Sequence, residues 1–282
     1  MKKLSIITAS VLAAAAVLTG CNDSSSSVTS VDSSAEIKLD TGSAADSSSG
    51  EETAPTYKSI KLMTYGDSIT DGFWLAGGYR KFLCDKLEEN GLSQYVDFVG
   101  SKKGGECYDN EHEGYTGFSI DRIEDSITGP RSGISMLMPK RIEKFQPDVV
   151  TLMIGTNDIL SNYELDTAGD RLEALLDKVF EKMPEGSVLF LATLPDMDAT
   201  NNTYIDKDTF TVEYMDKCIS DYNYMVKGLV DKKKQEGKNI RLADVSTVLV
   251  KSDLYDGVHP SEEGYKKLAD FWYDTITAYM AE

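Results

Sequence analysis

The clearest chemical signal in the sequence is a serine placed directly after a short apolar stretch. Residues Ile60–Met63 form the apolar stretch, Gly66 breaks it, and Ser68 stands where a helical turn is predicted to begin. The first N–H groups of a helix lack partners within the helix and carry partial positive charge, which favours a developing oxyanion. Ser68 is therefore a candidate nucleophile, with Asp67 in a supporting position. The alternative is that Asp67 and Ser68 only form a turn and cap the helix.

A nucleophilic serine needs a base within hydrogen-bond reach, and histidine is the usual choice. The chain has 2 histidines. His259 lies in Asp256-Gly-Val-His259, where the Asp256 carboxylate can turn back and accept a hydrogen bond from Nδ1 of the imidazole, leaving Nε2 for Ser68. The alternative is a turn at Asp256 followed by a surface histidine. His112 lies between two glutamates in a long loop, and we expect a surface or structural role for it.

Two further stretches offer hydrogen-bond donors for an oxyanion. Gly155-Thr-Asn157 follows an apolar run, and the side-chain amide of Asn157 is a donor of the required kind. Gly117 lacks a Cβ, so its backbone N–H can approach the same oxygen closely. Both signals also fit ordinary turns, because asparagine and glycine are common turn residues.

These four stretches are separated by segments that alternate between strand and helix patterns. The first predicted strand ends at Tyr65, and the others cover 95–99, 148–154, 188–194 and 240–245. The predicted helices cover 79–89, 136–145, 168–182, 209–234 (broken near Gly228) and 261–281. The long polar segment 101–119 is predicted to be a functional loop. Such alternation predicts one α/β domain with a parallel sheet covered by helices on both faces. The site would then lie beyond the carboxyl ends of the strands.

The order of the four motifs is similar to that of a known enzyme family. Gly66-Asp-Ser-Ile-Thr70, Gly117, Gly155-Thr-Asn157 and Asp256-Gly-Val-His259 follow one another as in the SGNH hydrolases, also called GDSL-type esterases. The resemblance spans about residues 61–281, with Ile69 where the family name implies leucine. It implies a three-layer α/β/α sandwich with five parallel strands in flavodoxin-like order, and it implies no metal or organic cofactor.

The resemblance also implies a role for each matched residue. Ser68 would be the nucleophile, His259 the base and Asp256 the carboxylate that orients the histidine. The N–H of Ser68, the N–H of Gly117 and the side chain of Asn157 would form the oxyanion hole.

A finer resemblance rests on two short stretches, Gly-Gly-Tyr-Arg80 and His-Glu-Gly-Tyr-Thr-Gly117. They look like the bacterial carbohydrate esterases of family three, which remove acetyl groups from xylan. The implied substrate is an acetylated polysaccharide or oligosaccharide, on which Trp74, Tyr115 or Phe118 could stack unless they belong to the core. A lysophospholipase- or thioesterase-type lipid hydrolase on the same fold is one alternative. A non-catalytic carbohydrate-binding lipoprotein is another.

The composition restricts the choice of partner. The chain of 282 residues has a formal net charge of −18. Nucleic acid binders neutralise phosphates with Lys and Arg, so this charge excludes nucleic acid and argues equally against binding to anionic lipid by charge. A strongly acidic surface keeps a protein dissolved, and we expect a monomer.

The N-terminal stretch has the composition of an export signal. Lys2 and Lys3 precede the apolar run Leu4–Leu18, and Leu18-Thr-Gly-Cys21 follows. This resembles a bacterial lipoprotein signal, so we expect residues 1–20 to be a signal peptide and lipidated Cys21 to anchor the protein at the cell surface. Secretion without an anchor is the alternative. The Ser- and Asp-rich residues 21–56 are predicted to be a disordered tether before a catalytic domain at 57–282.

Three cysteines remain once Cys21 is assigned to the anchor. Cys84, Cys107 and Cys218 cannot all pair with one another, and their spacing matches no zinc motif. The sequence leaves open whether two of these cysteines form a disulfide or whether they are buried free thiols.

Overall fold

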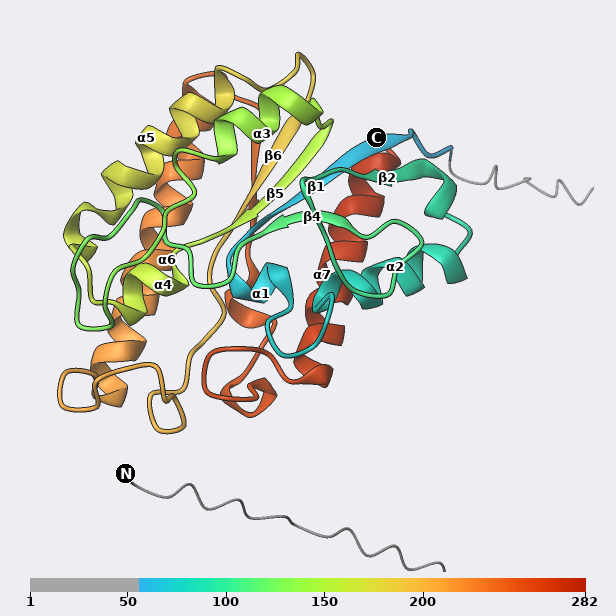
Figure 1. Cartoon of the computed structure of the whole chain (residues 1–282). Helices are drawn as coiled ribbons and strands as arrows, with labels where there is room; N and C mark the ends of the chain where they lie inside the picture. Colours follow the sequence, from blue (N-terminus) through green and yellow to red (C-terminus); the bar gives the residue numbers. More distant parts are fainter. Residues whose placement is uncertain (1–55) are drawn as a thin grey trace, which may run out of the picture. The chain divides into compact units, whose positions relative to one another are not determined.

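The structure is a computed structural model that describes residues 56–282 (Figure 1). The predicted signal peptide, Cys21 and all but the last residue of the predicted tether lie outside the described residues.

A mostly parallel sheet forms the centre of the described domain. Its strands are β1 (Ile60–Gly66), β2 (Val96–Phe98), β3 (Lys102–Lys103), β4 (Glu111–Gly114), β5 (Val149–Met153), β6 (Val188–Ala192) and β7 (Ile240–Ala243). The order β2-β1-β5-β6-β7 is parallel throughout and corresponds to the flavodoxin-like order. All residues of β5 and β6 are buried, as strands covered on both faces must be.

Helices cover both faces of this sheet. They are α1 (Ser68–Asp71), α2 (Tyr79–Glu89), α3 (Met138–Phe145), α4 (Thr156–Leu160), α5 (Ala168–Phe180), α6 (Val212–Gln235) and α7 (Glu262–Met280), with short 3₁₀ helices η1 (Ser93–Tyr95), η2 (Leu165–Thr167), η3 (Val245–Thr247) and η4 (Lys251–Asp253). Helices α2 and α7 pack together on one face, while α3, α5 and α6 lie on the other (Figure 1). The predicted three-layer α/β fold is confirmed.

The predicted strand count was wrong, because the segment 101–119 is not entirely loop. It contains β3 and β4, which pair antiparallel, and β4 pairs in parallel with Tyr65–Gly66 at the end of β1. β2 pairs with the first half of β1, so β2 and β4 lie one after the other along the same side of β1. The sheet therefore has seven strands rather than five. Strands of two to four residues with charged side chains lack the apolar pattern by which a strand is predicted.

The predicted break near Gly228 was also wrong. Helix α6 is continuous from Val212 to Gln235. A Cβ built on Gly228 would meet no atom within 4 Å, and its φ is not positive, so this glycine neither bends the helix nor serves close packing.

The structure resolves the alternatives left open for the cysteines. Cys84 on α2 and Cys107 in the loop between β3 and β4 form a disulfide, and Cys218 on α6 is free and buried. Among residues 56–282, no helix has both the length and the apolar character needed to cross a bilayer.

Candidate active site

Ser68 is held at the first position of α1, directly beyond the end of β1. The chain can turn there because Gly66 has no side chain: a Cβ would lie 2.4 Å from the Met153 carbonyl oxygen on β5 and 2.4 Å from Oγ1 of Thr70. Ser68 is 5% exposed, and its Oγ lies 2.8 Å from Nε2 of His259, which is 191 residues away in the sequence. The turn thus brings the hydroxyl to the imidazole at the carboxyl edge of the sheet.

Asp67 is the N-cap of α1. One carboxylate oxygen accepts a hydrogen bond from the Ile69 N–H at 3.0 Å, and the other has no hydrogen-bond partner among the described residues. The side chain is completely buried. This burial raises the pKa of Asp67 to about 6, against the opposing effect of the Ile69 hydrogen bond. Asp67 therefore supports the start of the helix. Among the described residues, no hydrogen bond joins its carboxylate to Ser68 Oγ or to the His259 ring.

The loop before α7 positions His259 and Asp256. Nδ1 of His259 lies 2.8 Å from Oδ2 of Asp256, and the Asp256 Oδ1 accepts the His259 backbone N–H at 2.8 Å. Gly257 between them has φ +84°, and a Cβ there would lie 2.6 Å from the Asn202 nitrogen. The turn therefore needs glycine, both for its backbone conformation and for its close approach to the neighbouring loop.

Asp256 remains ionised beside the histidine. Partial burial disfavours its charge, but hydrogen bonds from the ring and the backbone of His259 outweigh burial and lower the pKa of Asp256 to about 2. Oδ2 of Asp256 also accepts a hydrogen bond from the hydroxyl of Tyr204 at 3.0 Å. A carboxylate in this position fixes the tautomer of the imidazole and stabilises the imidazolium that forms when the ring takes a proton.

The other two predicted oxyanion donors follow β4 and β5, which end level with β1 at the same edge of the sheet. Asn157 is in the first turn of α4 and is 4% exposed; Gly117 follows β4 with φ +81°. Nδ2 of Asn157 donates to the Phe118 carbonyl at 2.8 Å, which leaves the second amide hydrogen for another acceptor. The backbone N–H groups of Ser68 and Gly117 have no acceptor among residues 56–282. All three donors are thus available.

Arg131 holds the Asn157 amide in this orientation. Its Nη1 donates to Asn157 Oδ1 at 3.0 Å, so the amide nitrogen must be the atom that faces Phe118 and the site. The guanidinium is itself fixed by Ser161, whose Oγ accepts from Nε at 2.6 Å. Sequence reasoning missed Arg131, because an arginine 26 residues before the asparagine carries no local signal.

The turn that carries Asn157 depends on close packing. Gly155 has φ +119°, and a Cβ there would lie 2.3 Å from the hydroxyl oxygen of Tyr222, which donates to the Ile154 carbonyl at 2.7 Å. The neighbouring Asp158 is fully buried and accepts from Nη1 of Arg171 at 2.6 Å and from the Ile120 N–H at 3.0 Å. Asp158 thereby ties α4 to the segment that follows Gly117.

Comparison with known proteins shows to which family the chain belongs. The model of the GDSL-like lipase/acylhydrolase family matches residues 62–272. The chain belongs to this family. Over 237 residues, 78% of this chain, the sequence is 35% identical to a multidomain esterase of Ruminococcus flavefaciens. The chain spans 29% of the length of that relative.

Solved structures agree with the family assignment. A Clostridium thermocellum family 3 carbohydrate esterase is 31% identical in sequence, with a TM-score of 0.61 over 80% of this chain and 100% of its own. A family 3 carbohydrate esterase from Talaromyces cellulolyticus is 21% identical, with a TM-score of 0.60 over 78% of this chain and 98% of its own, and shows the same fold. The domain is therefore a carboxylic ester hydrolase with the SGNH hydrolase fold.

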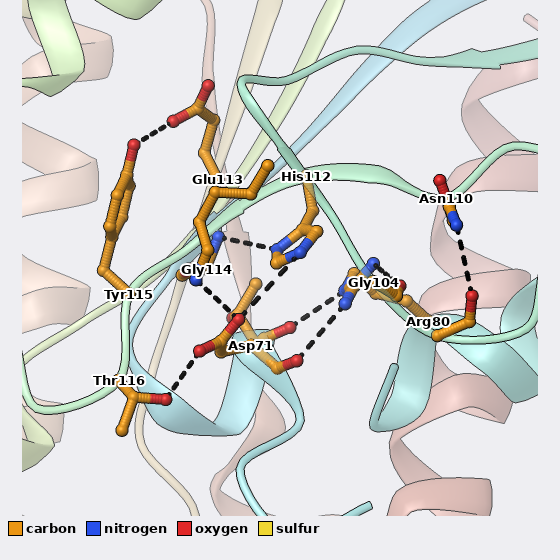
Figure 2. A network of polar contacts seen from close by, with 12 residues as sticks. Asp71, Arg80, Gly104, Asn110, His112, Glu113, Gly114, Tyr115 and Thr116 are labelled. Carbon is orange, nitrogen blue, oxygen red and sulfur yellow. Dashed lines mark hydrogen bonds and ion pairs between the residues drawn. The ribbon is translucent and has the colours of Figure 1, made fainter. Parts of the chain in front are cut away.

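A polar network joins α1 of this GDSL-like domain to the segment before Gly117 (Figure 2). Asp71, the last residue of α1, accepts a hydrogen bond from Oγ1 of Thr116 at 2.6 Å and pairs with Lys102 at 2.7 Å. Thr116 directly precedes Gly117. On the other side, Nε and Nη2 of buried Arg80 donate to the Thr70 and Asp71 carbonyls at 2.9 and 3.3 Å. The network therefore fixes α1 relative to the Gly117 N–H, and sequence reasoning missed Asp71.

His112 belongs to this network and is not a second base. It is 1% exposed, and its Nδ1 accepts the Gly114 N–H at 3.1 Å. Burial, helped by the nearby positive charge of Arg80, lowers the pKa of His112 to about 3. The ring thus remains neutral near pH 7, and of the two predicted roles the structure shows the structural one.

The aromatic residues proposed from the sequence are all half-buried. Tyr115 and Phe118 stack on each other at 5.0 Å and are half-buried, and the Tyr115 hydroxyl binds Glu113. Trp74 is also half-buried and packs under Tyr255 at 4.5 Å. The exposed aromatic side chains near the site are instead Phe73, Tyr204 and Tyr255. Such exposure depends on tertiary packing and cannot be predicted from the local sequence.

A groove of about 420 Å³ opens beside the candidate site, between two loops. It is lined by Ile127, Thr128, Arg131, Thr203, Tyr204, Ile205 and Asp206. Arg131 connects it to Asn157, and Tyr204 connects it to Asp256. A larger cavity of about 530 Å³ is lined by residues of α5 and α6, including Tyr222 and Cys218, but by none of the candidate site residues. Of these two cavities, the smaller groove is the one whose lining residues hydrogen-bond to candidate site residues.

Proposed function

We propose that this domain is an extracellular serine esterase that removes acetyl groups from a plant polysaccharide of the xylan type. The observation that carries the proposal is the continuous hydrogen-bonded line from Ser68 Oγ to His259 Nε2 and from His259 Nδ1 to Asp256 Oδ2, each contact 2.8 Å long. This arrangement gives the serine a base and gives the base an orienting carboxylate.

The first half-reaction transfers the acetyl group to the enzyme. Ser68 Oγ attacks the ester carbonyl carbon while Nε2 of His259 takes the hydroxyl proton. The carbonyl oxygen becomes an anion, which the free N–H groups of Ser68 and Gly117 and the second amide hydrogen of Asn157 stabilise. When the tetrahedral intermediate collapses, the bond to the sugar oxygen breaks, and Nε2–H of His259 gives its proton to the leaving oxygen.

The second half-reaction releases acetate. Water gives a proton to Nε2 of His259 and attacks the carbonyl of the acetyl-serine, forming a second tetrahedral intermediate at the same donors. Its collapse breaks the bond to Ser68 Oγ, which recovers the proton from His259. Asp256 remains ionised during both halves, as its pKa of about 2 requires near neutral pH.

Two observations support an acetylated sugar as the substrate. The lining of the groove beside the site includes a guanidinium, a carboxylate and three hydroxyl groups, from Arg131, Asp206, Thr128, Thr203 and Tyr204, together with Ile127 and Ile205. Such a lining suits a polyhydroxylated ligand better than a long acyl chain, which needs an apolar channel. The relatives with the carbohydrate esterase name point to the same class of substrate.

The proposal is tested by measuring acetate released from acetylated xylan, pectin and chitin fragments. Wild-type enzyme should release acetate from xylan, and Ser68→Ala should release none above background. A panel of nitrophenyl esters should show activity that falls beyond short acyl chains. Activity that instead rises with chain length would overturn the proposal in favour of a lipid or thioester hydrolase. Sugar binding without covalent labelling of Ser68 by a fluorophosphonate would show a non-catalytic binding protein.

The oxyanion role of Asn157 makes a separate prediction. Asn157→Ala removes one donor from the developing anion, so kcat should fall by about 10²–10³, with little change in KM. Kinetics with nitrophenyl acetate measure this directly. Asn90→Ala, at the exposed end of α2, is the matched control and should behave as wild type. Equal kcat values for the two variants would remove Asn157 from the oxyanion hole.

We further propose that the protein is a cell-surface lipoprotein anchored through Cys21. The proposal is supported by the charged and apolar stretches that precede Leu18-Thr-Gly-Cys21. Expression in a bacterial host should place the wild-type protein in the membrane fraction and label it with radioactive palmitate. Cys21→Ser should lose the label, and a variant that keeps it would contradict the anchor.

A further inference from the structure

Exposed aromatic side chains gather around the candidate catalytic histidine. Phe73, Tyr204 and Tyr255 are 49%, 38% and 63% exposed and come from three separate loops. The Phe73 ring stacks on the His259 imidazole with 4.8 Å between centroids, and the Tyr204 ring stands on edge against it at 5.7 Å. Tyr255 directly precedes Asp256, and its N–H donates to the His259 carbonyl at 2.7 Å. Water-exposed aromatic surface is thus concentrated where the reaction takes place.

Tyr255 is the most exposed of the three and is also rigidly supported. Trp74 packs against one face of its ring, with 4.5 Å between centroids and 18° between planes. Trp74 is in turn fixed by a hydrogen bond from its Nε1 to the Pro260 carbonyl at 2.8 Å. The 63% exposure of Tyr255 therefore belongs to the face and edge turned away from Trp74. A ring held in this way can bind a ligand with little loss of conformational freedom.

The chemistry of the reaction determines which part of the substrate would meet this surface. During acylation Nε2–H of His259 must reach the leaving oxygen, while the carbonyl oxygen faces the donors at Gly117 and Asn157. The alcohol part of the ester therefore lies on the His259 side. Phe73 and Tyr255 contact His259 through its ring and its backbone, so they border the leaving group and not the acyl group.

We propose that Tyr255, supported by Trp74 and flanked by Phe73, is a stacking platform for a pyranose ring of the polysaccharide whose acetyl group is removed. The inference rests on the proposed function and adds the subsite that binds the sugar chain. One face of a pyranose ring presents mainly C–H groups, which pack on the face of an aromatic ring, while the hydroxyl groups remain in water. A neutral sugar also suits a chain with a formal net charge of −18, which would repel an anionic polymer.

The test compares a polymeric substrate with a small one. Tyr255→Ala should raise KM for acetylated xylan about tenfold, in line with the strength of aromatic contacts. Its kcat/KM for nitrophenyl acetate, which has no sugar ring, should stay within about twofold of wild type. Tyr255→Phe keeps the ring and should keep the wild-type KM for xylan. Tyr224→Ala, which removes an 82% exposed tyrosine on α6, is the control and should change neither substrate.

The possible outcomes separate this inference from the proposed function. If wild-type enzyme releases no acetate from acetylated xylan, the proposed function fails first. If wild type is active but Tyr255→Ala leaves KM for xylan unchanged, the platform is overturned and the proposed function stands. If Tyr255→Ala loses activity equally on both substrates, Tyr255 supports the catalytic loop and the platform is likewise overturned. A thermal unfolding midpoint equal to that of wild type shows that the variant is folded.

Discussion

At the scale of single residues, Tyr204 contacts the carboxylate of the candidate triad from a separate loop. Its hydroxyl shares Oδ2 of Asp256 with the His259 ring, at 3.0 and 2.8 Å. Burial and the hydrogen bond to the Asp256 carboxylate raise the pKa of Tyr204 to about 12, so the hydroxyl keeps its proton over the working range. The shared oxygen therefore divides its negative charge between two donors.

The substitution Tyr204→Phe should lower kcat for nitrophenyl acetate. It removes a hydrogen bond that holds the Asp256 carboxylate, so Asp256 orients the His259 ring less firmly. Because a hydrogen bond of this kind is worth about 0.5–1.5 kcal/mol, kcat should fall roughly two- to tenfold with little change in KM. Kinetics at about pH 7, where Asp256 is ionised, measure the difference.

Tyr108→Phe is a matched control for this prediction. Tyr108 is also 38% exposed, and its hydroxyl donates at 3.0 Å to the Val96 carbonyl, within the loop between β3 and β4 and the adjacent β2. This variant should keep the wild-type kcat. A kcat for Tyr204→Phe equal to that of Tyr108→Phe would show that the Tyr204 hydroxyl has no influence on the triad.

Asp67 makes a prediction about stability rather than rate. Its pKa is about 6 in the folded protein, above the value of about 3.9 for an unperturbed aspartate. Between these values the folded state holds a proton that the unfolded chain has lost, so the contribution of Asp67 to stability falls as pH rises through this window. Asp67→Asn keeps an oxygen that can cap Ile69 and removes the charge. The unfolding midpoint of Asp67→Asn should therefore exceed that of wild type by more at about pH 7 than at about pH 4.

Asp67→Ala separates the cap from the charge. It loses the acceptor for the Ile69 N–H, so near about pH 4 it should be destabilised by about 1 kcal/mol for the lost cap, and this loss should shrink near about pH 7, where the substitution also removes the buried charge. A difference between Asp67→Asn and wild type that does not change with pH would mean that the buried carboxyl does not titrate as stated.

At the scale of elements, the long apolar or amphipathic segments were predictable and the short ones were not. The prediction for α2 matches Tyr79–Glu89, and the five core strands differ from their predicted ranges only at their ends. Strands β3 and β4 were missed because they are held in place by strand pairing and by ion pairs of Lys102 with Asp71 and of Glu113 with Arg141, which lie in other parts of the chain. A periodicity argument sees only neighbours along the chain.

The same distinction applies to the site. Ser68, Asn157 and His259 occur in short motifs, each with a glycine whose place the structure explains by a close contact or a positive φ. Arg131 and Tyr204 reach Asn157 and Asp256 from other loops through side-chain hydrogen bonds. Asp71, at the end of α1, accepts a hydrogen bond from Thr116, the neighbour of Gly117. Their sequence contexts contain no motif, so only the folded structure reveals their contacts.

The link between α1 and the segment before Gly117 can be tested with one isosteric change. Thr116→Val removes the hydroxyl that donates to Asp71 at 2.6 Å and keeps the shape of the side chain. Gly117 should then be less well positioned, and kcat should fall roughly two- to tenfold, since a hydrogen bond of this kind is worth about 0.5–1.5 kcal/mol. KM for nitrophenyl acetate should hardly change, because the loss concerns the developing anion.

Thr116→Ser distinguishes the hydrogen bond from the methyl group. It keeps the donor and should retain most of the wild-type kcat. If Thr116→Ser is as slow as Thr116→Val, the methyl packing and not the link to Asp71 controls the segment.

For the molecule as a whole, the disulfide links the helical layer to the edge of the sheet. Cys84 is fully buried on α2, and Cys107 lies in a loop that also contacts β2, where Oδ2 of Asp109 accepts the Phe98 N–H at 2.7 Å. Neither cysteine contacts Ser68, Asn157 or His259. The bond should therefore stabilise the fold without affecting the chemistry.

Reducing this bond should lower the free energy of unfolding by about 3 kcal/mol, because it releases a closed loop with a sequence separation of 23 residues in the unfolded chain. Urea unfolding with and without a phosphine reductant measures the difference. The Cys84→Ala/Cys107→Ala variant should unfold with the same free energy under both conditions, whereas Cys218→Ala, which lacks only the free thiol, should keep the full response to reductant. Activity on nitrophenyl acetate at room temperature should survive reduction. A wild-type unfolding curve that the reductant does not shift would mean that the loop gains nothing from the bond, and that hydrogen bonds such as Asp109 to Phe98 hold it unaided.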